Sequence, residues 1–271
     1  MLNIWSGVRK IRYPQLHDFY VVKAMEKNFN VNWNHGEGEV GFFYEGQGFE
    51  DINKTKIPAG FWSIDTDTYQ IWKDLNKDIT IFVASYNFLD VAKNLAKKDN
   101  IYFLPQGFDP ESYFPIEEKE LNYDIGFMGR FDGYPLREEH LNYLKSLGFK
   151  VKIELTDILH PLGIEKVREF YSDCKTIYNN SQFGINMRVF EALALKKPLL
   201  TNRIYKCPDI LFKNNEHLFI FEYKKDLATQ LDYIIGNEDE RKRIAENGWR
   251  EVQQYTWDNE VKKAIDILMM K

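Results

Sequence analysis

The chain has 271 residues, of which 44% are hydrophobic and 15% aromatic, enough to bury one large core or two smaller ones. A formal charge of -5 and a pI near 5.7 exclude a general basic field that would attract nucleic acid, although 36 Lys and Arg leave room for a local basic patch. Cys174 and Cys207 stand far apart and outside any Cys-x-x-Cys motif, which argues against a disulfide framework or a zinc site. No signal-peptide pattern and no apolar run of ~20 residues occurs, so a soluble cytoplasmic protein is expected.

Short apolar runs alternate with longer amphipathic runs in the first half, a pattern typical of a parallel sheet covered by helices. Strands are expected at residues 2–6, 40–44, 59–64, 79–84 and 101–104, and helices near 15–28, 68–75 and 87–97. The following run carries Gly107, Pro110 and Pro115 and leads into the charged residues 117–120. This composition predicts a linker between domains.

A second series of the same kind begins with residues 124–129, which predict a strand ending at Gly129. Further strands are expected at 150–154, 175–178, 198–201 and 217–221, and helices near 137–147, 164–172 and 187–195. The tail is predicted to be helical over 224–235 and 239–254. A last helix has Thr256 as its expected N-cap, with Val261, Ile265 and Leu268 as its apolar stripe.

Residues 179–201 form the most informative segment, since they read as a strand end, a polar loop, a helix and a second strand. The helix N-terminus leaves backbone N–H groups unpaired at the positive end of the helix dipole, which suits a phosphate. Arg188 can add a forked donor, and Glu191 can accept from a sugar hydroxyl. The segment therefore predicts a pocket for a nucleotide diphosphate. The alternative is an ordinary amphipathic helix, with Arg188 and Glu191 solvated and a core face of Val189, Phe190, Leu193 and Ala194.

Four segments occur in an order and spacing that carry a resemblance. They are Lys56-Ile-Pro-Ala-Gly-Phe-Trp-Ser-Ile-Asp65, the stretch from Phe82-Val-Ala-Ser to Pro115, Tyr123-Asp-Ile-Gly-Phe-Met-Gly129, and Arg188-Val-Phe-Glu-Ala-Leu-Ala194 with Pro198-Leu-Leu-Thr201. The chain resembles the GT-B glycosyltransferases, specifically the group 1, spore-maturation-protein-like branch that is similar to glycosyltransferase family 4. Its closing Tyr255-Thr-Trp-Asp258 also looks like the terminal segment of that family.

This resemblance implies an α/β fold with two Rossmann-like domains that face each other across a cleft. Residues 1–116 would form the acceptor side, 117–255 would bind the nucleotide sugar, and 256–271 would form a helix that packs back on the first domain. The implied activity moves a sugar from a nucleotide-diphosphate sugar, expected to be a UDP-sugar, to an unidentified hydroxyl acceptor. No metal and no other cofactor is expected, since arginines and helix-end N–H groups can stabilise the leaving diphosphate.

The resemblance assigns particular roles to single residues. Glu191 matches the carboxylate that binds the donor ribose, and Arg188 would lie near the diphosphate. Gly129 with Arg130 forms a glycine-containing turn, while Arg137 is a second candidate for phosphate charge. Ser6 and Gly7 correspond loosely to the glycine loop of related enzymes. The expected donor-binding residues are Ser6, Gly7, Gly129, Arg130, Arg137, Asn186, Met187, Arg188 and Glu191.

The catalytic base is expected among polar residues near the first sheet. Asp65 is the first choice because it follows a predicted parallel strand, at the edge where clefts form, although it could instead cap a helix ahead of Thr68. His35 is the second choice, and His17 on the first predicted helix is a further candidate. Phe183 stands where related retaining enzymes have an acidic residue, so retention and inversion both stay open.

Other functions also fit parts of the sequence. Asp65-Thr-Asp67 could hold a divalent ion in a metal-dependent transferase. A sugar-nucleotide epimerase and a non-catalytic nucleotide-sugar-binding subunit would use the same fold, whereas a dinucleotide oxidoreductase lacks its GxGxxG motif after the first strand. The acceptor could be a glycan, a lipid-linked sugar, a protein or, through Arg9-Lys-Ile-Arg12, modified DNA.

Overall fold

The computed structural model describes residues 1–6, 17–33, 37–44, 52–64, 71–117, 119–156, 163–182, 184–203 and 208–270. Its contacts divide the chain into two compact units. The N-terminal unit comprises Met1–Gly107, Phe183–Ile185 and Tyr255–Lys271, and the C-terminal unit comprises Phe108–Gln182 and Asn186–Gln254. No helix in these described ranges is both long and apolar enough to cross a membrane.

The N-terminal unit contains a six-stranded sheet in the order β2-β1-β3-β4-β5-β6, and every strand pair in it is parallel. Its strands are β1 (Asn3–Ser6), β2 (Asn30–Trp33), β3 (Val40–Tyr44), β4 (Ala59–Ser63), β5 (Thr80–Val83) and β6 (Ile101–Phe103). Strand β2 was not predicted, because its sequence Asn-Val-Asn-Trp has no apolar run. It lies at the sheet edge, where only one neighbour pairs with it and its side chains are not fully buried.

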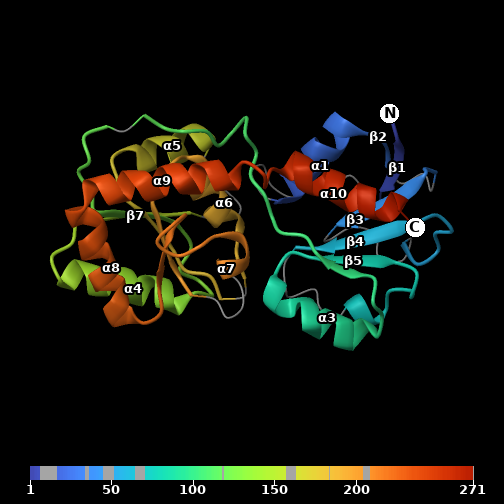
Figure 1. Ribbon diagram of the computed structural model, residues 1–271, viewed down its shortest axis with the longest axis horizontal. Helices are drawn as coiled ribbons and strands as arrows, with labels where there is room; N and C mark the ends of the chain where they lie inside the picture. The colour runs from blue at the N-terminus through green and yellow to red at the C-terminus, as the bar shows by residue number, and fades with distance from the viewer. Residues whose placement is uncertain are drawn as a thin grey trace. The chain divides into compact units, whose positions relative to one another are not determined.

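Helices cover both faces of this sheet, with α1 (His17–Asn28) and α10 (Trp257–Met269) on one face and α3 (Leu89–Ala96) on the other (Figure 1). A 3-10 turn, η2 (Tyr86–Phe88), precedes α3. Successive side chains of each strand point to opposite faces of the sheet. Phe61 of β4 packs into the cluster that includes Ala92 of α3, whereas Trp62 lies 5.6 Å from the Trp257 ring of α10.

Helix α10 is joined to α1 by apolar and polar contacts. The rings of Tyr20 and Trp257 stack with centroids 6.3 Å apart, and Asp258 pairs with Lys27 at 2.9 Å and accepts from Asn28 at 3.1 Å. Gly60 on β4 provides room for this packing, since a Cβ there would meet Leu268 at 3.1 Å. The last helix is therefore part of the N-terminal core.

The C-terminal unit contains a second parallel sheet, with five strands in the order β11-β10-β9-β7-β8. Its strands are β7 (Ile125–Gly129), β8 (Val151–Leu155), β9 (Ile177–Asn179), β10 (Leu199–Asn202) and β11 (Phe219–Phe221). Its helices are α4 (Pro135–Ser146), α5 (Ile164–Ser172), α6 (Met187–Ala194), α7 (Pro208–Leu211), α8 (Lys224–Gly236) and α9 (Glu238–Val252). Helices α4 and α8 pack on one face, and α5 and α6 pack on the other, with α9 against α6 (Figure 1). The predicted α/β fold with two Rossmann-like parallel sheets is confirmed.

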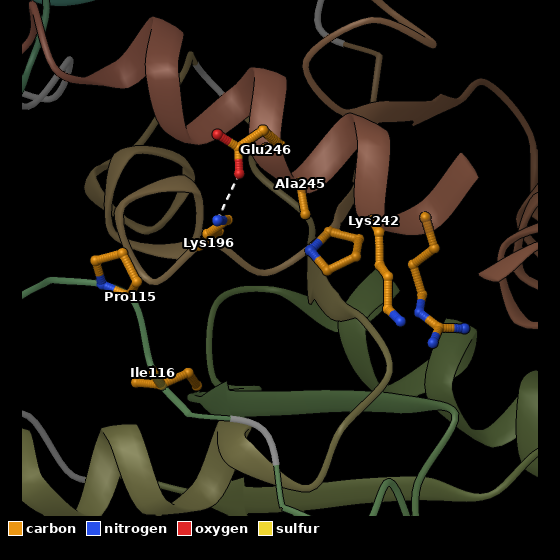
Figure 2. A pocket seen from close by; sticks show the side chains of 8 residues that line it. Pro115, Ile116, Lys196, Lys242, Ala245 and Glu246 are labelled. Atoms are coloured by element: carbon orange, nitrogen blue, oxygen red, sulfur yellow. Dashed lines mark ion pairs between the residues drawn. The ribbon is translucent and has the colours of Figure 1, made fainter. Parts of the chain in front are cut away.

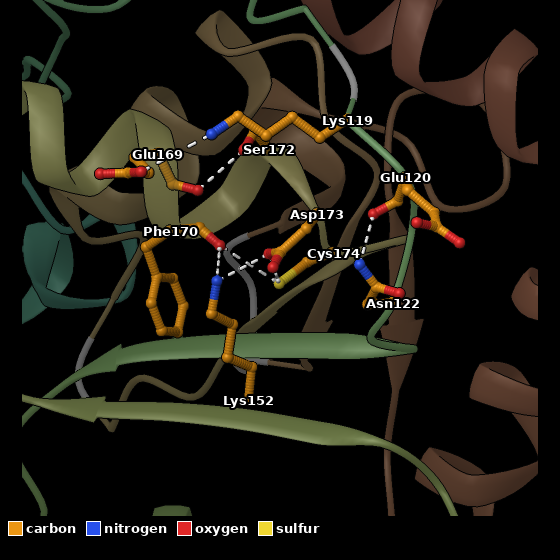
Figure 3. A network of polar contacts seen from close by, with 9 residues as sticks. All are labelled: Lys119, Glu120, Asn122, Lys152, Glu169, Phe170, Ser172, Asp173 and Cys174. Carbon is orange, nitrogen blue, oxygen red and sulfur yellow. Dashed lines mark hydrogen bonds and ion pairs between the residues drawn. The ribbon is translucent and has the colours of Figure 1, made fainter.

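A polar network ties α5 to strand β8 (Figure 3). Lys152 Nζ donates to the Phe170 carbonyl at 2.9 Å and pairs with Asp173 at 2.7 Å. Cys174 lies beside them as a free, buried thiol, and burial raises its pKa to about 12. This thiol is therefore protonated and unreactive at neutral pH. Cys207 lies outside the described residues.

Candidate functional site

The candidate site lies at the carboxyl edge of the C-terminal sheet, where β7 ends at Gly129 and β9 ends at Asn179. The chain runs from β7 to β8 on one side and places β9 on the other, so strand order reverses between these two central strands. A crevice forms at such a switch point in doubly wound sheets, and ligands bind there. Helix α6 begins at Met187, directly after the loop that leaves β9.

Gly129 allows a guanidinium to lie against the end of β7. A Cβ at this position would stand 2.7 Å from Arg188 Nη2 and 3.0 Å from the Phe127 ring. The guanidinium carbon of Arg188 lies 5.1 Å from the centre of the Phe127 ring, a cation-π contact. The absence of a side chain at this strand end is therefore what lets α6 place a positive charge over the sheet edge.

Arg137 brings a second positive charge to the same ring. Its side chain is 5% exposed and donates from Nε to the Asn180 carbonyl and from Nη1 to the Arg130 carbonyl, both at 3.0 Å. Burial, followed by repulsion from Arg188, lowers the pKa of Arg137 to about 10. Within the described residues neither Arg137 nor Arg188 forms an ion pair with a carboxylate. Two converging cations that form no ion pair among the described residues favour the binding of an anion here.

Glu191 lies about one turn further along α6. Burial raises the pKa of its carboxyl to about 7, while a hydrogen bond from the Tyr113 hydroxyl and the charge of Arg188 act in the opposite direction. Tyr113 itself is 5% exposed. A carboxylate in this setting is therefore poised between its two protonation states near neutral pH.

Three polar atoms around the start of α6 are buried and have no hydrogen-bond partner among the described residues. They are Asn186 Oδ1, Arg188 Nη1 and Glu191 Oε1. Asn186 occupies the N-cap position, but its side chain does not cap the helix and donates instead to Asn179 Oδ1 at 3.3 Å. Each buried polar atom without a partner costs about 1–3 kcal/mol. Three such atoms on one short segment are the pattern of a surface built for a polar ligand.

The structure thus brings together five of the residues expected to bind the donor: Gly129, Arg137, Asn186, Arg188 and Glu191. Two more lie beside them. Arg130 is exposed and adds a charge that also lowers the pKa of Arg137, and Met187 is the half-buried first residue of α6.

The alternative of a solvated face for Arg188 and Glu191 is wrong, because both are half-buried. The opposite face of α6 is in the core as expected, with Val189, Phe190, Leu193 and Ala194 all buried. Tyr113 was not predicted as a site residue. It stands in the sequence among linker residues, and no local pattern indicates that its hydroxyl reaches a carboxylate on α6.

The remaining predicted residues belong to the N-terminal half of the chain. Ser6 ends β1 and is fully buried in the N-terminal unit. Gly7, His35 and Asp65 lie outside the described residues, as does Asp67. Among the described residues there is no group of three or more His, Cys, Asp or Glu side chains able to hold a metal ion.

Residues 135–266 match a family model described as "Glycosyl transferase-like", which spans just under half of the chain. A search of curated protein sequences finds no match. The matched segment contains most of the C-terminal unit, including Arg137, Arg188 and Glu191.

Solved structures share the whole fold at low sequence identity. Anabaena Alr3699/HepE in complex with UDP is 10% identical, with 100% of each chain covered and a TM-score of 0.65. An alpha-glucosyltransferase in complex with UDP and a 13-mer DNA containing a HMU base is 10% identical, with 99% of each chain covered and a TM-score of 0.66. TarM, from S. aureus, is 11% identical with a TM-score of 0.63; 93% of this chain is covered but only 58% of TarM. The chain therefore spans less than two thirds of the length of TarM.

The two parallel-sheet units therefore form a GT-B fold. Together with the family match they support a glycosyltransferase as the class of enzyme. The fold that the sequence resemblance implies is thereby confirmed. The finer spore-maturation-like branch stays a prediction.

Proposed function

We propose that this protein transfers a sugar from a nucleotide-diphosphate sugar to a hydroxyl acceptor, with the donor bound at the start of α6. The observation that carries the proposal is the set of three buried, unpartnered atoms on Asn186, Arg188 and Glu191. A nucleotide diphosphate supplies what these atoms lack, because phosphate oxygens accept hydrogen bonds and ribose hydroxyls both donate and accept.

In the proposed complex Arg188 binds the diphosphate and Arg137 adds charge behind it. Bound phosphate would relieve the repulsion that lowers the pKa of Arg137. The uncapped N-terminus of α6 faces the same anion with its free N–H groups. Glu191 Oε1 would accept from a ribose hydroxyl, while Tyr113 holds the carboxylate in place.

Catalysis follows from where charge develops. When the bond between the sugar and the diphosphate breaks, negative charge grows on the leaving oxygens and the sugar ring gains cationic character. Arg137, Arg188 and the helix end are fixed beside those oxygens, so they stabilise the transition state more than the ground state. We propose that this arrangement needs no metal. Asp65, or else His35, would remove the acceptor proton.

Uridine is the base proposed for the donor, since the structure of Anabaena Alr3699/HepE was solved with UDP and with UDP-glucose. We further propose that residues 1–116 serve the acceptor, that 117–255 bind the donor, and that the chain belongs to the spore-maturation-like branch. The acceptor is left open, because a likeness of 10% identity to an enzyme solved with DNA concerns the fold alone.

A thermal-shift screen of nucleotide sugars tests the donor site. One donor should raise the unfolding temperature of the wild type and lose most of that effect in Glu191→Ala. Glu169→Ala is the matched control, since its carboxylate is 74% exposed on α5 and lies on an element that does not contribute to the site. An equal shift in wild type and Glu191→Ala would refute the assignment of Glu191 as a ribose ligand.

Assays of enzymatic turnover distinguish the proposed sugar transfer from the alternative functions. Release of nucleoside diphosphate that depends on an acceptor, and that survives a chelator, supports the proposed reaction. Loss of activity with the chelator would favour a metal held by Asp65-Thr-Asp67. Isomerisation of the donor without an acceptor would indicate an epimerase, and binding without turnover across a panel of glycans, lipid-linked sugars, proteins and modified DNA would indicate a binding subunit.

A further inference from the structure

A pocket of about 400 Å³ lies in the C-terminal unit between α9, the turn that joins α6 to β10, and residues 115–116 (Figure 2). Part of its wall is apolar, from Pro115, Ile116, Pro198 and Ala245. The backbone N–H of Ile116 donates to the Leu195 carbonyl at 3.2 Å, which fixes this segment against the end of α6. The volume falls in the range of small-molecule pockets.

This pocket lies at the amino edge of the sheet, opposite the candidate donor site. Pro198 directly precedes β10, and its carbonyl accepts from Thr176 and Ile177 at the start of β9, both at 2.9 Å. The donor site is built where β7 and β9 end, at Gly129 and Asn179. The two sites are therefore separated by the length of the strands.

The polar part of the wall carries more positive than negative charge. Its cations are Lys196, Arg241 and Lys242, and its one carboxylate is Glu246. Lys196 pairs with Glu246 at 2.5 Å, as Figure 2 shows, and Lys242 pairs with Glu238 at 2.5 Å. Both lysines thus have carboxylate partners within the chain.

Arg241 is different. Its side chain is only 5% exposed, yet within the described part of the chain its guanidinium forms no hydrogen bond and no ion pair. Two other arginines of α9 are paired: Arg243 with Glu240 at 2.5 Å and Arg250 with Glu246 at 2.8 Å. Arg241 is one of the residues that line the pocket.

A guanidinium that has lost most of its water and gained no acceptor is costly to the fold. An anion in the pocket would supply the missing acceptors, and Arg241 offers the forked geometry that binds phosphate oxygens in pairs. The nearby lysines would add charge, and the apolar wall would take a carbon skeleton. From these features we infer that the pocket binds a small organic phosphate, with its headgroup on Arg241 and its apolar body against Pro115, Ile116 and Pro198.

Titration of the full chain with phenyl phosphate, followed by calorimetry at constant ionic strength, tests this inference. The wild type should bind it saturably, and Arg241→Gln should weaken binding about tenfold or more, as expected for a lost hydrogen bond to a charged group. Arg243→Gln is the matched control on the same helix and should change binding less than about twofold, because Arg243 is paired with Glu240 outside the pocket wall. Arg188→Ala should retain binding, which separates this pocket from the donor site.

Three further measurements can overturn the inference. Without any anion, Arg241→Gln should unfold at the same or a higher temperature than wild type, and a lower one would mean that Arg241 has a structural role. Inorganic phosphate should bind more weakly than phenyl phosphate, since it lacks an apolar body. Benzoate that binds as tightly as phenyl phosphate would refute the phosphate headgroup, and an equal loss in Arg241→Gln and Arg243→Gln would reveal screening rather than a site.

Discussion

Replacing Glu191 with glutamine should remove a pH dependence that this carboxyl imposes on donor binding. Burial raises its pKa to about 7, and the partners that favour the ionised form, Tyr113 and Arg188, only partly offset this. A ribose hydroxyl that donates to Oε1 binds the ionised carboxylate more strongly than the neutral acid. Below pH 7 we therefore expect donor binding to release a proton from Glu191.

The magnitude follows from the size of the shift. For each pH unit below the pKa of Glu191 in the free protein, the free energy of donor binding weakens by about 1.4 kcal/mol, which is a factor of ten in affinity. Between about pH 8 and pH 5.5 the affinity of wild type should then fall roughly 30-fold, or about 2 kcal/mol. The same shift acts on stability. Because the folded pKa of Glu191 is raised above its ordinary value, stability from this group is greatest below about pH 4.5 and is lost as pH rises to about 7.

Calorimetric titration with UDP-glucose at several pH values measures the effect. This donor is suitable because its phosphates stay ionised throughout the range, whereas the terminal phosphate of UDP itself titrates. Binding to wild type should release up to one proton near pH 6, seen as a dependence of the heat on the buffer, whereas Glu191→Gln should bind more weakly at pH 8 and with a flat profile. His140, whose pKa burial lowers, is common to both proteins and cancels in the comparison. Parallel slopes for the two proteins would refute the assignment.

Three other substitutions have expected outcomes. Gly129→Ala should weaken UDP-glucose binding about tenfold in calorimetry, because its Cβ would stand 2.7 Å from Arg188 Nη2 and displace the guanidinium; unchanged affinity would contradict this. Thr256→Ala should lower the free energy of unfolding by about 1 kcal/mol in urea, since its hydroxyl accepts from the Asn259 N–H at 3.2 Å and caps α10. Glu260→Gln should gain about 1–3 kcal/mol of stability relative to wild type between pH 5 and pH 8, because burial raises the pKa of this carboxyl to about 7 and its Oε2 has no partner; a constant difference across that range would refute the assignment.

The sequence predicts the two sheets well because both are parallel and buried on two faces. Such strands read as short continuous apolar runs, as in Ile125-Gly-Phe-Met-Gly129, and all five of its residues are buried. Strand β2 could not be predicted in this way. Its pairing with β1 depends on a neighbour that is distant in the chain, and its edge position leaves no apolar pattern to detect.

The residues of the candidate site likewise fall into those that the local sequence predicts and those that only the fold brings together. Arg188 and Glu191 are predictable because they lie on one helix next to its N-terminus, where local spacing determines which side chains share a face. The convergence of Arg137 on the Phe127 ring and of Tyr113 on Glu191 is a property of the folded unit. No local period relates those residues, so only the structure reveals that two guanidiniums and a protonatable carboxyl meet at one strand edge.

The direction of the helices distinguishes the proposed donor site of the C-terminal unit from the proposed phosphate pocket. In a parallel sheet with crossover helices, helix N-termini lie at the carboxyl edge, so the N-terminus of α6 would help Arg188 bind the proposed anion there. Lys196 stands at the other end of α6, where a positive charge complements the helix dipole and pairs with Glu246. The helix dipole does not explain the position of Arg241. This residue lies near the positive N-terminal end of α9, directly after the acidic residues that complement that end of the helix. Within the described residues the guanidinium of Arg241 forms no ion pair, although its charge adds to the effect of Lys242 in lowering the pKa of Glu238 one turn earlier. Measurement on Arg241 rather than on Lys196 therefore decides whether the amino-edge pocket is a binding site.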